Sequence, residues 1–245
     1  MKSRVDPGDP SLADKAYLAI RDEILRGQLR PGTPLSRRRL AVELGMSVLP
    51  VANALDRLQQ DGLVETRARA GTRVRVPTEA SVRELYELRE ALESQSARLV
   101  AERATHAERL ELRRLAAQVD VLFGRLAASG ADQALRFAVH SQHVQLHMRI
   151  AECARSPLLQ QMIERNHVLL LNWLYDVMGR RTALPDQFHS KLADAIVSGD
   201  PDQADAAMRA HVRYGFAEIV GRISALETSE WRERRSTRRA VLAKT

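Results

Sequence analysis

The chain has 245 residues, a length that suggests one large or two modest domains. Its 38 Lys and Arg outnumber its 31 Asp and Glu and give a formal net charge of +7. Hydrophobic residues make up 44%, enough for a folded core, and the low aromatic share of 4% favours helices over sheets. A single cysteine, Cys153, excludes a disulfide framework and cysteine-rich zinc fingers. The lack of a long apolar run excludes a membrane span and a signal peptide, so we expect a cytoplasmic protein.

Three helices are predicted in the first 62 residues. Each follows a serine that suits the N-cap position, carries apolar residues at helical spacing and ends at a glycine. Ser11 forms a capping box with Asp14. The segment Arg30–Pro34 is predicted to be a turn, because its two prolines and its glycine do not suit a helix. The serines are Ser11, Ser36 and Ser47, and the glycines are Gly27, Gly45 and Gly62.

A two-stranded hairpin is predicted after the third helix. Apolar residues alternate in Leu63–Arg67 and again in Thr72–Val76, on either side of a loop that contains Gly71. Three helices and a hairpin in this order predict a winged helix-turn-helix over residues 1–77, with the domain junction at Pro77–Thr78.

From residue 78 to about 226 the pattern is helical throughout. We therefore predict a mostly α protein in which the winged domain is followed by an all-α antiparallel bundle over residues 78–227 and a basic tail over 228–245. Leu85 and Leu88 are predicted to lie on the buried face of the first helix of this bundle. The predicted helices run from Thr78 to about Arg103, Thr105 to Ala128, Asp132 to Cys153, Ser156 to Met178, Leu184 to Val197 and Pro201 to Leu226.

Positive charge is concentrated at the two ends of the chain. Residues 1–77 carry 14 Lys and Arg against 9 Asp and Glu, and residues 228–245 carry 6 against 2, whereas residues 78–227 carry 18 against 20. This asymmetry is typical of a basic module that meets phosphate joined to a module that does not, although charge that only maintains solubility gives the same pattern. The basic tail is either a frayed helix end or an addition to a DNA-binding surface.

The winged domain resembles a known family. Gln28–Ser36, Leu40–Ser47 and Asp61–Val64 are similar to the DNA-binding domain of GntR-family transcription regulators, and the resemblance covers about residues 12–76. It implies binding to a double-stranded DNA operator, with the third helix in the major groove. The sequence departs from the family at Val48 and Ala52, where members usually carry arginines that contact DNA.

Arg38 matches a third DNA-contacting position of the family and is retained. We expect arginines around it and around the wing to contact phosphates, while base readout depends on the third helix and the wing. Alternatively, Val48 and Leu49 contact thymine methyl groups. A second alternative is that the domain no longer binds DNA specifically. The predicted DNA-binding residues are Arg37, Arg38, Arg39, Ser47, Leu49, Asn53, Arg67, Arg69, Thr72 and Arg73.

Two histidines, His143 and His147, lie four residues apart and therefore share one face of a helix. This spacing lets two imidazoles reach one metal ion, although such a pair is more often solvated or placed at the edge of a core.

The helical region resembles the FCD domain, the effector domain of FadR-type GntR regulators, in Tyr86–Glu93, Leu146–Ala154 and Ala207–His211. Many FCD domains bind a divalent metal through one Asp and three His, which the resemblance places at His147, His189 and His211, with His143 at the Asp position. A shell of four imidazoles favours Zn²⁺ or Ni²⁺ over Mg²⁺ or Ca²⁺. The alternative is a polar core of hydrogen-bonded histidines.

Arg89 matches an arginine that often points into the FCD cavity, so the resemblance implies an effector-binding role in which Arg89 holds a carboxylate. The alternative is a helical pair with Glu93, four residues on.

Together these features predict a ligand-responsive repressor: a homodimer that binds an operator through its winged domain and a small carboxylate metabolite through its helical domain. A metal-dependent hydrolytic enzyme and an effector-independent DNA-binding protein are the alternatives. The enzyme is disfavoured because Glu152, the nearest acidic residue in sequence, lies off the histidine face.

Overall fold

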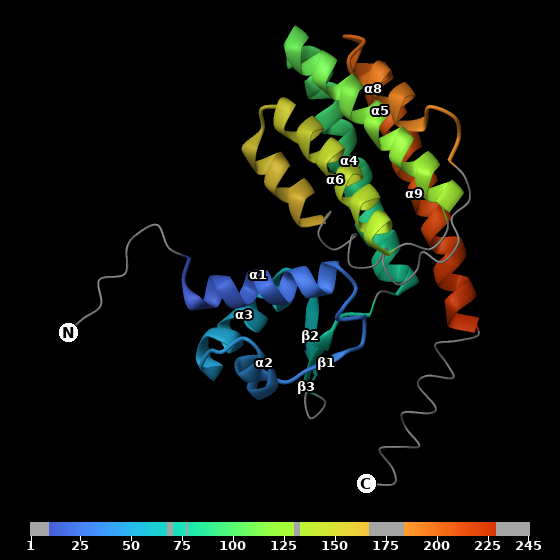
Figure 1. Ribbon diagram of the computed structural model, residues 1–245. Coiled ribbons are helices and arrows are strands. Elements are labelled where there is room, and N and C mark those ends of the chain that lie inside the picture. The colour runs from blue at the N-terminus through green and yellow to red at the C-terminus, as the bar shows by residue number, and fades with distance from the viewer. Residues whose placement is uncertain (1–9, 68–70, 77, 130–132, 167–183, 229–245) are drawn as a thin grey trace, which may run out of the picture. The chain divides into compact units, whose positions relative to one another are not determined.

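The computed structural model describes residues 10–67, 71–76, 78–129, 133–166 and 184–228 (Figure 1). The chain divides into two compact units, Met1–Val76 and Pro77–Thr245, and each unit is described by itself. Among the described residues, no helix has the length and apolar character needed to cross a membrane.

The first unit is a winged helix-turn-helix, as predicted. Its helices are α1 (Leu12–Leu25), α2 (Arg37–Glu43) and α3 (Val48–Gln60), and its strands are β1 (Pro34–Leu35), β2 (Val64–Arg67) and β3 (Gly71–Val74). The strands form an antiparallel sheet in the order β1-β3-β2. The core is made by apolar residues of all three helices and of the sheet, including Ile20, Leu40, Leu55, Leu58, Leu63 and Val74.

Two local predictions in this unit are corrected. Pro34 does not end a plain turn but begins β1, whose Leu35 pairs with Thr72 of β3. β1 therefore adds a third strand to the predicted hairpin, and its Leu35 is only 5% exposed. Ser47 is the N-cap residue of α3 but makes no capping hydrogen bond through its side chain. The predicted caps at Ser11 and Ser36 are confirmed.

The second unit is a helical bundle in which long helices lie side by side (Figure 1). α4 packs along α9 and against α6, while α5 packs against α6 and α8. The helices are α4 (Glu79–Arg103), α5 (His106–Ser129), α6 (Gln133–Cys153), α8 (Phe188–Ile196) and α9 (Pro201–Thr228). A further helix is described over 157–166; its predicted end at Met178 lies outside the described residues, as do residues 229–245 of the basic tail.

The buried face of α4 differs from the predicted one. Leu88 is 48% exposed, whereas Arg89 and Glu93 are 3% and 2% exposed. Because Val82, Leu85, Arg89 and Glu93 follow one another at spacings of three or four residues, they form one continuous helical stripe, and Leu88 lies beside it. This stripe carries a buried ion pair into the bundle, next to the histidines described below.

Candidate metal centre and nucleic-acid surface

Four histidines from three helices come together inside the bundle. His143 and His147 lie on α6, His189 on α8 and His211 on α9. His147, His189 and His211 are 2%, 1% and 7% exposed, and His143 is half-buried. The structure thus brings together all four predicted metal-ligating residues.

The spacing of the imidazole nitrogens fits a shared ion. The Nε2 atom of His147 lies 3.0 Å from Nε2 of His143 and 3.1 Å from Nε2 of His211, and the His143 and His211 Nε2 atoms are 3.3 Å apart. Metal–nitrogen bonds of about 2.0–2.1 Å place neighbouring ligand nitrogens roughly 3.0–3.4 Å apart. His189 belongs to the same group, because His143, His189 and His211 offer nitrogens within 4.8 Å of one another.

Two carboxylates orient these rings from behind. Nδ1 of His147 lies 2.5 Å from Oε2 of Glu93, and Nδ1 of His189 lies 2.7 Å from Oδ1 of Asp120. The hydrogen bond with Asp120 holds the ring proton of His189 at Nδ1 and leaves its Nε2 lone pair available to a metal, and the contact with Glu93 favours the same arrangement for His147. Burial, followed by the electrostatic effect of the nearby His147 and His189, holds the pKa of His211 well below its usual range, which favours the neutral form of this ring that can bind a metal.

Asp120 also anchors the start of α8. Its carboxylate accepts hydrogen bonds from the backbone N–H groups of His189 and Ser190 and from the Ser190 hydroxyl. Burial opposes ionisation of Asp120, but the bonds from His189 and Ser190 outweigh it and hold the pKa of Asp120 at about 2. Gln187, the N-cap residue of α8, gives no capping bond of its own, so Asp120 supplies the cap from α5.

Arg89 lies behind the same cluster. Its Nε lies 2.6 Å from Oε1 of Glu93, and its guanidinium is 4.8 Å from the centre of the Tyr86 ring. The pairing with Glu93 that sequence spacing offered as the alternative is present, but it is buried rather than on the helix surface. Arg89, Glu93 and His147 form a continuous charged and polar chain that leads to the histidine cluster.

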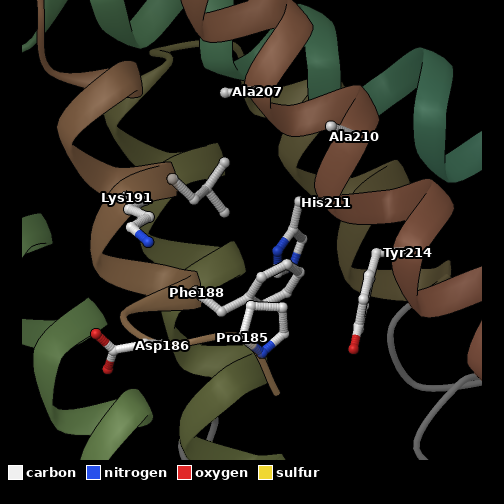
Figure 2. A pocket seen from close by; sticks show the side chains of 9 residues that line it. Pro185, Asp186, Phe188, Lys191, Ala207, Ala210, His211 and Tyr214 are labelled. Atoms are coloured by element: carbon white, nitrogen blue, oxygen red, sulfur yellow. The ribbon is translucent and has the colours of Figure 1, made fainter.

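A cavity of about 330 Å³ has His211, one of the four clustered histidines, in its wall (Figure 2). It lies between α8, which carries Phe188 and Lys191, and α9, which carries His211 and Tyr214 (Figure 2). The rings of Phe188 and His211 stack with their centres 4.9 Å apart. One ligand candidate therefore contributes both to the cavity wall and to the imidazole cluster.

On the first unit, the predicted cations of α2 are exposed. Arg37 pairs weakly with Asp56 at 3.7 Å, and Arg39 pairs with Glu43 at 3.3 Å. The side chain of Arg38 has no ion pair or hydrogen bond within the described part of the chain. Arg38 is therefore the α2 cation that can reach a phosphate without first breaking an ion pair.

The predicted contacts of the wing are partly occupied by the hairpin itself. Arg67 and Arg73 both pair with Glu65, and the buried Thr72 hydroxyl lies 3.0 Å from that of Thr66. Arg69 lies outside the described residues. On α3, in contrast, Ser47, Leu49 and Asn53 are all exposed.

Sequence reasoning missed Glu93 as a partner of His147, and it missed Asp120 entirely. Glu93 carried a signal, because it lies four residues from Arg89 and was considered as the partner of that arginine. Asp120 carried none, because 69 residues separate it from His189 and only the packing of α5 against α8 brings them together.

Two family models match the chain. Residues 12–74 match the bacterial regulatory proteins of the gntR family, and residues 84–214 match the FCD domain.

Curated relatives extend over most of the chain. It is 31% identical to a probable D-xylose utilization operon transcriptional repressor of Paenarthrobacter nicotinovorans, over 78% of this chain and 80% of the relative. It is 25% identical to the HTH-type transcriptional repressor RspR of Escherichia coli K12, over 94% of this chain and 97% of the relative.

Solved structures share the fold. A GntR transcriptional regulator from Rhodococcus sp. RHA1 has a TM-score of 0.70 at 23% identity, covering 86% of this chain and 99% of that one. Escherichia coli McbR/YncC has a TM-score of 0.64 at 22% identity, and the match covers 85% of this chain and 97% of that chain.

Proposed function

Because the chain belongs to the gntR family of bacterial regulatory proteins and carries an FCD domain, we propose that its helical unit senses a metal-bound carboxylate and thereby controls operator binding. The chain is a transcriptional regulator and not an enzyme. We further propose that the protein is a FadR-type repressor that acts in the cytoplasm as a homodimer and binds paired operator half-sites.

The DNA-binding role is assigned to exposed residues of the first unit. Arg38, flanked by Arg37 and Arg39, is suited to phosphate contacts, and the exposed start of α3 is suited to base edges. The arginines of the wing take part only if they exchange Glu65 for phosphate, because Arg67 and Arg73 both pair with that residue.

The metal site is assigned to His143, His147, His189 and His211. The observation that carries this assignment is the set of Nε2–Nε2 distances of 3.0, 3.1 and 3.3 Å among His143, His147 and His211. A shell of four imidazole ligands favours Zn²⁺ or Ni²⁺. A bound ion supplies a positive charge that attracts an anionic effector.

A small carboxylate is the effector class that this charge favours. Arg89 is the proposed second contact for that carboxylate. Its Nε and Nη2 atoms already face Glu93 and its side chain also hydrogen-bonds Tyr86, so an effector carboxylate must exchange with one of these partners. Glu93 then links the effector position to His147, which lies on α6.

The test is a DNA-binding titration of the full chain. A duplex selected from random sequence is titrated with protein that has been stripped by a chelator, and again with protein loaded with Zn²⁺, at one salt concentration. We expect the two DNA affinities to differ by about 5–150-fold, the usual size of coupling between two sites. Equal affinities would contradict control of operator binding by the metal site.

A further inference from the structure

We propose that the third helix of the first unit reads thymine methyl groups in the operator, through Leu49 and Val48. This inference rests on the proposed operator binding and names the chemistry by which the operator is recognised.

The first two turns of α3 present an uncharged surface. Leu49 is 69% exposed and Val48 is 45% exposed, although Val51 in the same turn is fully buried. Asn53 follows on the exposed side, and the first charged residue of the helix is Asp56. Exposure of two large aliphatic side chains costs hydrophobic free energy in the unbound protein, so an apolar partner is expected for them.

Basic residues flank this apolar surface. Arg37, Arg38 and Arg39 at the start of α2 are exposed, and α2 packs against α3. Val42, one helical turn after Arg38, is 82% exposed. A surface with exposed aliphatic groups and adjacent arginines fits a polyanion that displays apolar groups between its phosphates, rather than an uncharged protein face.

Duplex DNA offers one such apolar group. In the major groove each base edge presents hydrogen-bond donors and acceptors, and only thymine adds a methyl group. Leucine and valine can neither donate nor accept a hydrogen bond, so their favourable base contact there is with that methyl. Arginine at position 48 or 52 would instead favour guanine, and Val48 and Ala52 exclude that contact.

The experiment removes single methyl groups from the DNA. The full chain selects binding sites from a random duplex library, with a chelator and with Zn²⁺ in parallel. The selected duplex is then made with deoxyuridine in place of each invariant thymine, and affinities are compared. We expect each critical substitution to weaken binding at least about five-fold, the low end for a lost base contact, whereas deoxyuridine at variable positions has no effect. The salt dependence should stay unchanged, because no phosphate contact is altered.

Protein variants assign the effect to Leu49. The Leu49→Ala variant should lose the preference for thymine over deoxyuridine at the base that Leu49 contacts, while Leu18→Ala, which truncates a leucine that is 51% exposed on α1, should keep the full thymine preference. Selected sites that tolerate deoxyuridine at every position would overturn the methyl readout but leave operator binding intact. A failure to select any sequence would overturn both proposals. If Leu49→Ala lowers the oligomeric mass and leaves the thymine preference unchanged, the surface is an interface between copies of the chain, and the methyl readout is wrong.

Discussion

At the residue scale, His143 is the most informative position of the candidate site. The family resemblance places an aspartate there, so the usual negative charge is missing from the ligand shell. The structure has carboxylates one step further out, with Glu93 behind His147 and Asp120 behind His189. These carboxylates increase the basicity of their rings and thereby offset part of the missing charge.

Replacement of His143 by aspartate should change the metal preference. Because carboxylate oxygen suits Mn²⁺ better than imidazole does, we expect His143→Asp to raise the affinity for Mn²⁺ relative to Ni²⁺ by on the order of ten-fold. Competition titrations with the two ions measure this ratio. His106→Asp, which changes an exposed histidine outside the cluster, is the control. An unchanged ratio would mean that position 143 is not a ligand.

Removal of the Asp120 charge should weaken metal binding without touching a ligand. Asp120→Asn keeps the shape of the side chain but removes the negative charge that increases the basicity of His189 and one of the two acceptor oxygens that hold the start of α8, so we expect zinc affinity to fall by about 10–100-fold. Isothermal titration measures the loss. Asp194→Asn is the matched control, because Asp194 lies on α8 and pairs with Arg113 away from the histidines. Equal affinities of the two variants would contradict the positioning role of Asp120.

At the element scale, local signals predict the helices well and their buried faces less well. The caps at Ser11, Ser36 and Thr105 could be predicted because the bonding partners lie three residues away. The exposure of Leu88 could not, because the buried stripe of α4 contains the polar residues Arg89 and Glu93. The Asp120 cap on α8 could not be predicted either, since it joins distant segments.

The cap of α5 should make stability depend on pH. The backbone N–H of Thr105, then Arg155, hold the pKa of Glu108 at about 2, below its usual 4.5. A lowered pKa stabilises the folded state above about pH 4.5, and this contribution is lost as pH falls from 4.5 towards 2. We expect Glu108→Gln to cost about 1 kcal/mol near pH 6, because water screens this partly exposed charge, and far less near pH 2. Denaturant unfolding of metal-free protein checks this, and a loss independent of pH would contradict it.

At the scale of the whole molecule, the two-part organisation could be predicted from charge and motif order, and the four ligand candidates from the family resemblance. Their supporting carboxylates required the packed bundle. An operator with two paired half-sites is bound by two DNA-binding units that belong to one oligomer.

We therefore expect the full chain to sediment at twice its mass of 27.5 kDa at micromolar concentration. Sedimentation equilibrium of untagged protein measures this. A monomeric mass in the presence of both Zn²⁺ and operator DNA would rule out the proposed homodimer.

The convergence of four imidazoles on one ion is tested most directly by the metal content of untagged full-length protein, compared with His147→Ala. We predict close to one equivalent of zinc or nickel per chain in the unaltered protein after dialysis, and a large loss in the variant. Less than about a tenth of an equivalent, with no uptake when zinc is titrated back, would contradict the metal site and leave the histidines as a hydrogen-bonded core.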